Sequence, residues 1–130
     1  MDESGHREVR QLGQPVISCL ARVEVPAALW GKERSGELSG TDAGLLVTEF
    51  IGDYEGGADE SPRFVALALE ERILRVAAGL CARHGLRAYD GVQLASAVAA
   101  RAVDPACSGF ACFDAELTRA AAREGFDIPI

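Results

Sequence analysis

The chain has 130 residues, of which 48% are hydrophobic and 25% charged, and these values predict a single globular domain over residues 1–130. No apolar run reaches the roughly 18 residues that cross a bilayer, and the polar first ten residues resemble neither a signal peptide nor a transit peptide. We therefore expect a cytoplasmic protein without membrane contact. The net charge of −7 argues against a basic face that binds nucleic acid. It is typical of a protein whose carboxylates surround a hard cation, or of one that pairs with a basic partner.

The four cysteines form no C-x-x-C pair, and neither histidine has the spacing of a zinc ligand. We expect free thiols in a reducing compartment, most of them in apolar surroundings. The cysteines are Cys19, Cys81, Cys107 and Cys112.

The first third of the chain predicts one short helix, one strand and two longer helices. Residues 4–12 suit a short helix that Gly13 ends, and residues 15–18 (PVIS) suit a brief buried strand. An apolar stripe at helical spacing follows, and because Pro26 lies inside it the helix either bends or begins later than Ser18. The stripe comprises Leu20, Val23, Ala27 and Trp30. The next helix is expected at residues 41–54, capped by Thr41 or Ser39.

Strands and helices continue to alternate in the rest of the chain. After a loop at residues 54–62, the patterns predict a strand at 63–67, an amphipathic helix that Gly85 ends, an apolar helix that runs to about Val103, a strand at 109–113, a helix at 115–125 and a final strand at 126–130. This alternation predicts an α/β fold, a three-layer α/β/α arrangement around a parallel sheet. In such sheets the ligand site lies beyond the carboxyl ends of the strands.

Three acidic residues stand out because of their settings. Asp90 lies at the start of a helix that is almost wholly apolar, although a buried carboxylate costs several kcal/mol unless it is paired. Asp114 directly follows the apolar run GFACF, and Glu24 flanks the apolar stripe of the first long helix. Carboxylates that converge on one cleft repel each other unless a cation neutralises them, and a set of oxygen ligands favours Mg²⁺ or Mn²⁺ over zinc.

Each acid also has a purely structural interpretation. Asp90 and Gln93 fit a D-x-x-Q capping box, and Asp114 fits the N-cap of the last helix. Glu24 could point into solvent, or pair with Arg22 or Arg34.

Three segments resemble the downstream signature segments of PIN-domain ribonucleases, and in particular the VapC toxins of bacterial toxin–antitoxin pairs. The segments are ISCLARVEVPAALW, HGLRAYDGVQLASAVAA and GFACFDAELTRAAAREGF. The most specific part is LRAYDGVQLASA, and the resemblance extends over essentially the whole chain, weakest over residues 35–62. Glu24, Asp90 and Asp114 fall on the acidic positions of the family pattern.

The resemblance implies a metal-dependent endoribonuclease with an α/β/α fold, usually a homodimer, that a small antitoxin protein inhibits. Glu24, Asp90 and Asp114 would be the catalytic residues and would hold one or two Mg²⁺ or Mn²⁺ ions. The ions would activate a water that attacks an RNA phosphodiester in line, and would stabilise the charge on the phosphate oxygens. Ser18 would orient a ligand or water, or cap the first long helix; Gln93 would contact substrate, or only cap its helix.

The chain departs from the family pattern at its start. Family members begin with a central strand that carries a metal-binding aspartate, and this chain lacks that strand; Asp2 and Glu3 do not replace it. We expect weaker metal binding and exposed strand edges as a result. Two explanations stay open at this point: a true start codon upstream of Met1, or a decayed, inactive PIN protein.

Two other functions compete with the nuclease. One is a PIN-like interaction module that binds an antitoxin but no longer cuts RNA. The other is a plain α/β domain whose acidic residues are helix caps.

Overall fold

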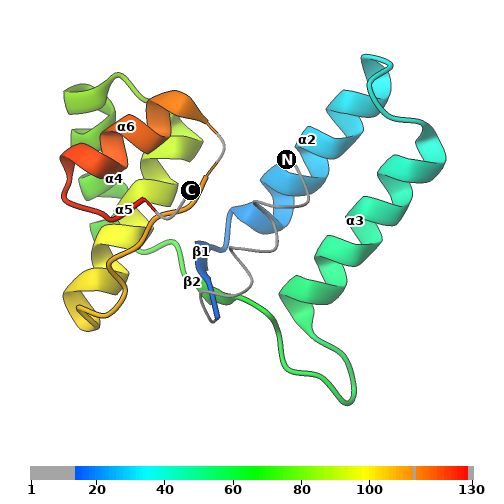
Figure 1. Ribbon diagram of the computed structural model, residues 1–130, viewed down its shortest axis with the longest axis horizontal. Coiled ribbons are helices and arrows are strands. Elements are labelled where there is room, and N and C mark those ends of the chain that lie inside the picture. The colour runs from blue at the N-terminus through cyan, green and yellow to red at the C-terminus, as the bar shows by residue number, and fades with distance from the viewer. Residues whose placement is uncertain (1–13, 113, 129–130) are drawn as a thin grey trace.

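The computed structural model describes residues 14–112 and 114–128, and these residues form a mixed α/β domain (Figure 1). The predicted α/β class is therefore confirmed. The elements are β1 (Val16–Ser18), α2 (Ala21–Arg34), α3 (Gly40–Glu55), β2 (Val65–Leu67), α4 (Glu71–His84), α5 (Ala88–Val103) and α6 (Ala115–Arg123). The helix expected at residues 4–12 lies outside the described residues.

The strands β1 and β2 pair in parallel, with Val16 opposite Val65 and Ser18 opposite Leu67. A second parallel contact is a single bridge between Gly109 and Asp127. Within the described residues, the strands expected at 109–113 and 126–130 are reduced to this bridge. The sheet proper thus has two strands, β1 and β2, in the part of the chain that the structure describes.

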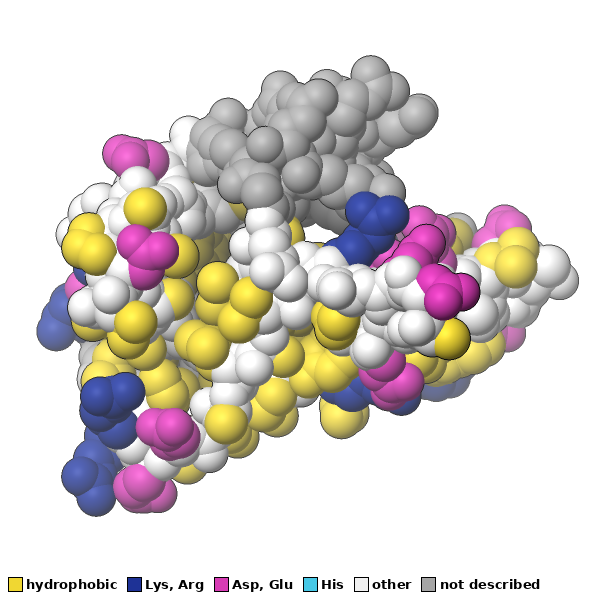
Figure 2. Space-filling model, turned by 90° about the horizontal axis from the view of Figure 1, so that it is seen from below, with side chains coloured by type: hydrophobic (Ala, Val, Ile, Leu, Met, Phe, Trp, Pro, Cys, Tyr) yellow, Lys and Arg dark blue, Asp and Glu magenta, His cyan; other side chains and the backbone are white. Residues whose placement is uncertain are grey.

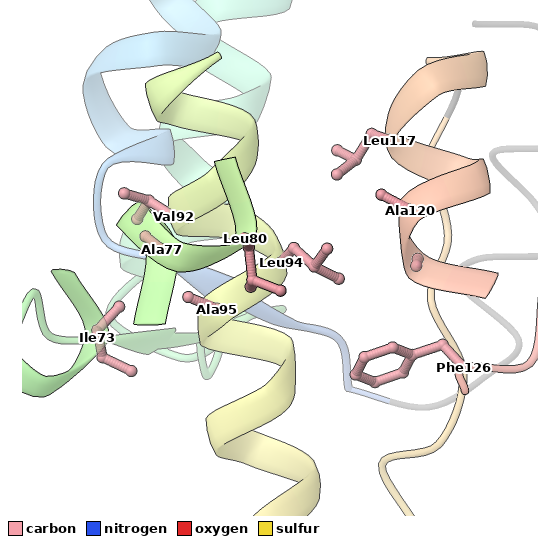
Figure 3. Packing of buried hydrophobic residues seen from close by; sticks show 10 residues of the cluster. Ile73, Ala77, Leu80, Val92, Leu94, Ala95, Leu117, Ala120 and Phe126 are labelled. Carbon is pink, nitrogen blue, oxygen red and sulfur yellow. The ribbon is translucent and has the colours of Figure 1, made fainter. Parts of the chain in front are cut away.

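The core of the domain lies between α4, α5 and α6 (Figure 3). Leu94 of α5 has no exposed surface and lies at the centre of this cluster, between Leu80 of α4 and Leu117 of α6. Phe126 closes the cluster after α6, and the Arg101 guanidinium lies 4.0 Å from the centre of its ring. Burial of these side chains is the main source of stability in this part of the molecule.

Helices α4 and α5 approach each other closely because residue 91 is glycine. A Cβ atom at Gly91 would overlap Cys81 Sγ and would lie 3.1 Å from the carbonyl oxygen of Ala77. The turn between the two helices also needs a glycine, because Gly85 has φ +67° and ends α4 in the left-handed conformation. The predicted stop at Gly85 is thus confirmed.

Helices α2 and α3 form a hairpin, which we call the arm, on the other side of the two strands (Figure 1). Ala21 and Ala43 are the buried residues of these two helices. Trp30 of α2 packs against Gly44 of α3, where a Cβ would lie 3.8 Å from the indole ring. Helix α2 begins at Ala21, later than Ser18, and still contains Pro26.

The start of α3 follows the capping rule. Ser39 is the N-cap, and its hydroxyl accepts a hydrogen bond from the Asp42 N–H at 3.0 Å. Of the two predicted caps, Ser39 is therefore correct and Thr41 is wrong.

A cavity of about 280 Å³ lies between the strands, the start of α4 and the end of α5. Its lining is mostly apolar and includes Val16, Val65, Ile73 and Val103. Figure 2 views the molecule from below and shows hydrophobic side chains spread between charged ones on that face. Since none of Glu24, Asp90 and Asp114 lines this cavity, it is separate from the predicted site.

Candidate acidic site

Asp90 lies inside the first turn of α5, not at its cap. The helix begins at Ala88, and the N-cap is Arg87, whose side chain makes no capping hydrogen bond. Gln93 bonds elsewhere, to the backbone of β1. The capping-box interpretation of Asp90 and Gln93 is therefore wrong, because the helix starts earlier than that motif requires.

The carboxyl group of Asp90 is surrounded by other acids. Partial burial is the largest cause that raises its pKa, and the charge of Asp114 is the next. The Arg87 guanidinium opposes this shift in the pKa, while Glu116 and Glu24 add to it. Two of the three acids that the sequence predicts, Asp114 and Glu24, thus raise the pKa of the third, although the three come from α2, α5 and the start of α6.

The pKa of Tyr89, the residue before Asp90, is also raised by nearby acids. Burial is the main cause that raises the pKa of its phenol to about 12, followed by the charges of Glu24 and Asp90. The phenol therefore keeps its proton at neutral pH and can donate a hydrogen bond. The sequence did not single out Tyr89 or Glu116, because their proximity to Asp90 depends on how the helices pack.

Asp114 also has the structural role that its position suggested. It is the N-cap of α6, and its Oδ1 atom accepts a hydrogen bond from the Leu117 N–H at 2.8 Å. The capping interpretation of Asp114 is therefore confirmed. Since Asp114 is an exposed residue and the cap uses one carboxylate oxygen, this role does not bury the charge.

Glu24 lies in the first turn of α2 and is exposed. The Arg22 side chain, one of its suggested partners, pairs instead with Glu55 of α3, at 3.1 Å between Nε and Oε1. This pair joins the two helices of the arm. Glu24 itself contributes to the raised pKa of Asp90 and of Tyr89.

Ser18 and Gln93, the two predicted substrate-binding residues, bond to each other. The Ser18 N–H donates to Oε1 of Gln93 at 2.9 Å, and the Ser18 hydroxyl accepts from the Leu20 N–H at 3.2 Å. Ser18 has no exposed surface. This burial argues against direct contact with a substrate, and the hypothesis that Ser18 orients a ligand or water stays a prediction. The interpretation of Ser18 as the N-cap of α2 is wrong, because that cap is Leu20.

The acidic group offers the type of donor atom that a hard divalent cation prefers. Glu24, Asp90, Asp114 and Glu116 supply only oxygen donors, which Mg²⁺ and Mn²⁺ prefer, and a cation would offset the repulsion at Asp90. Among residues 14–112 and 114–128, however, no group of three or more His, Cys, Asp or Glu side chains is close enough to hold a metal ion. The four acids therefore share one electrostatic neighbourhood without forming a closed set of ligands.

No protein-family model, no curated protein and no solved structure matches this chain. None of the described helices is long and apolar enough to cross a membrane. The fold and the site define a mixed α/β domain in which Asp114, Glu116 and Glu24 raise the pKa of Asp90.

Proposed function

We propose that this protein is a metal-dependent endoribonuclease of the PIN type, similar to the VapC toxin of a toxin–antitoxin pair, with a three-layer α/β/α fold. The observation that carries the proposal is the convergence of acids from separate segments. Glu24, Asp90 and Asp114 are far apart in the chain, yet Asp114 and Glu24 both raise the pKa of Asp90. Perturbed carboxyl groups of this kind are typical of catalytic sites.

In this proposal Glu24, Asp90 and Asp114 hold Mg²⁺ or Mn²⁺. When bound, such an ion would act as a Lewis acid: it would lower the pKa of a water molecule and offset negative charge on the phosphate. Arg87, whose charge acts on Asp90, gives the otherwise acidic region a positive group for an RNA phosphate. The protonated phenol of Tyr89 provides a hydrogen-bond donor beside Asp90 and Glu24.

We propose that the arm binds the protein partners, a second copy of the chain and a small antitoxin. Large apolar side chains of the arm are exposed, among them Val23 at 66% and Leu45 at 65%. Exposed large apolar side chains of this kind can contribute to a protein-binding surface.

The alternative function is a PIN-like interaction module that no longer cuts RNA. The observation in its favour is that the described acids do not form a closed set of ligands, and that Asp114 already uses one oxygen as a helix cap. In this case the arm would bind an antitoxin, and the acids would be a remnant of the nuclease site.

An RNA-cleavage assay separates the two functions. The purified protein is incubated with single-stranded RNA and Mg²⁺ or Mn²⁺, with and without EDTA, beside Asp90→Asn. Asp59→Asn is the matched control, because it removes the same charge from an exposed loop between α3 and β2. We expect cleavage that EDTA and Asp90→Asn abolish and that Asp59→Asn leaves unchanged.

Other outcomes of this assay decide against the nuclease. Cleavage that survives EDTA or Asp90→Asn would point to a contaminating enzyme. Absence of cleavage together with tight binding to a small neighbouring protein would favour the interaction module. Absence of both would leave a plain α/β domain with capped helices.

A further inference from the structure

We propose that the outer edge of β2 binds an extended, basic segment of another protein, which adds to the sheet as a third strand and places an apolar side chain in the cavity beside it. Strand addition of this kind combines main-chain hydrogen bonds, which give affinity, with side-chain pockets, which give specificity. The inference goes beyond the proposed function, because it uses neither the acidic residues around Asp90 nor the arm.

The first step concerns the backbone of β2. The Val65 N–H donates to the Pro15 carbonyl at 2.8 Å, and the Leu67 carbonyl accepts the Cys19 N–H at 2.9 Å, so Val65 and Leu67 face β1. In a parallel pair, the residue between them directs its N–H and carbonyl to the other side. That residue is Ala66, which is exposed and makes no hydrogen bond within the part of the chain that the structure describes. The outer edge of β2 therefore offers a donor and an acceptor to an incoming strand.

The outer edges of β1 and β2 differ in how they are protected. On β1, the Ser18 N–H donates to Oε1 of Gln93 at 2.9 Å, and Ser18 is buried. On β2, no side chain of the described residues bonds to Ala66 in this way, and the run FVALAL at residues 64–69 contains neither a charge nor a proline. Natural edge strands usually carry such residues to prevent pairing with other chains. The composition of β2 therefore favours an edge that pairs with another chain.

The second step concerns the cavity of about 280 Å³ beside the sheet. Val65 and Leu67 of β2 line it, as does Val103 at the end of α5, which is 84% exposed. Because Val65 is itself 40% exposed, the cavity is open to solvent next to β2. Pockets for drug-sized molecules are usually larger, at roughly 300–1,000 Å³. We therefore infer that the cavity takes one large apolar side chain of the added strand.

The third step concerns charge, which indicates the chemistry of the partner. Glu70 and Asp104 line the cavity, together with the guanidinium of Arg72. Arg63, directly before the strand, is paired with Asp53 at 2.8 Å between Nε and Oδ1, so this pair adds no net charge. The whole chain has a net charge of −7. A segment with lysine or arginine on both sides of its apolar residues is therefore attracted to this edge, whereas an acidic segment is repelled.

The test uses a synthetic peptide in which leucine and threonine alternate between pairs of lysines. Binding to the full chain is followed by fluorescence anisotropy. Two further peptides carry N-methyl groups on the threonines only or on the leucines only. Because alternate residues of a strand direct their N–H groups to opposite sides, only one of these two peptides loses its bonds to β2. A last peptide has glutamate in place of lysine.

Substitutions in the protein test the same surface. Ala66→Pro removes the outward N–H and leaves the bonds to β1, because proline is tolerated where the N–H of an edge strand faces solvent. Ala58→Pro, in the exposed loop before β2, is its matched control. Ala100→Phe fills the cavity, and Ala102→Phe, at an exposed position of α5 outside the cavity, is the matched control for it.

We expect the lysine peptide to bind the wild type, and Ala66→Pro and Ala100→Phe each to weaken that binding about 10-fold. Both control variants should bind within about twofold of the wild type. One N-methylated peptide should bind about 10-fold more weakly than the other, a result that tests the edge even if Ala66→Pro does not fold. The glutamate peptide should bind about 10-fold more weakly than the lysine peptide at low salt.

Other results would overturn the inference. Absence of binding by the lysine peptide would contradict it outright. Equal binding of the two N-methylated peptides would mean that the cavity takes a side chain without strand pairing, and equal binding of the glutamate peptide would contradict a basic partner. A wild-type dimer that Ala66→Pro separates and the peptide does not would mean that a second copy occupies the edge. None of these results depends on RNA cleavage, so this inference and the proposed function fail separately.

Discussion

The body of the molecule, made of α4, α5 and α6, and the arm, made of α2 and α3, are built in different ways. The body buries large side chains from all three helices in one cluster around Leu94. The arm buries Ala21 and Ala43 and exposes several of its larger apolar side chains. Because stability follows the apolar surface that is buried, we expect the body to contribute more to the stability of the fold than the arm does.

The acidic cluster lies where the two regions meet. Glu24 comes from the base of the arm, whereas Asp90 and Asp114 come from the body. Any change in how the arm sits on the body therefore changes the spacing of these acids.

The largest expected difference between the two regions is in the cost of removing a leucine. Leu94→Ala should lower the free energy of unfolding by about 3–5 kcal/mol, because it leaves a cavity in the core. Leu45→Ala, in the arm, should change it by less than about 0.5 kcal/mol, because Leu45 is 65% exposed. Urea unfolding measures both values; equal losses would show that the arm contributes to the core.

Two glycines of the body should respond in opposite ways to substitution by alanine, because one lies against a neighbouring helix and the other does not. Gly91→Ala should destabilise the protein by about 1–3 kcal/mol, because its methyl group would collide with Cys81 and crowd the Ala77 carbonyl. Gly79→Ala, in α4, has nothing within 4 Å of the new methyl group, and should stabilise the helix by about 0.5–1 kcal/mol. Thermal unfolding of both variants tests this, and stabilisation by Gly91→Ala would contradict the close approach of α4 and α5.

The smallest expected effect concerns Glu124, whose carboxylate contacts Arg83 and His84 at the end of α4. The hydrogen bond from His84 is the largest cause that lowers the pKa of Glu124 below its ordinary value of 4.5, and Arg83 adds to it. Since the folded-state pKa is lowered, the contribution to stability is present above about pH 4.5 and is lost as pH falls through the folded-state pKa.

Glu124→Gln should therefore lower the free energy of unfolding by about 1–2 kcal/mol at pH 7. The difference from the wild type should disappear once the pH is below the folded-state pKa of Glu124. Glu71→Gln is the control, because Glu71 and Arg75 form an exposed pair at 3.8 Å that contributes little. A loss in Glu124→Gln that stays constant while Glu124 of the wild type becomes protonated would mean that the carboxylate charge is not its cause.

Local signals in the sequence were enough to predict most helices. The stop at Gly85 and the end of α5 at Val103 follow from residue type and apolar pattern, and the structure has them at those residues. The start of α5 was less predictable, because its N-cap, Arg87, makes no side-chain hydrogen bond and so leaves no signal. The run GFACF predicted a strand, but only Gly109 forms a bridge among the described residues.

The candidate site was predictable only in part. Glu24, Asp90 and Asp114 could be selected because a charge beside an apolar segment is unusual, and the charges of Asp114 and Glu24 both raise the pKa of Asp90. The bond from Ser18 to Gln93 joins residues 75 positions apart, so no local pattern could reveal it. The same holds for Tyr89 and Glu116, which meet the other acids only through helix packing.

The proposal that Glu24, Asp90 and Asp114 share one divalent ion is tested most directly by NMR with substoichiometric Mn²⁺, which broadens the signals of nearby nuclei. We predict that the backbone amide signals around these three residues broaden together, before those of the acidic loop at Asp59 and Glu60, and that excess Mg²⁺ reverses the effect. Broadening of the three segments at different Mn²⁺ concentrations, or of the loop first, would contradict a shared site.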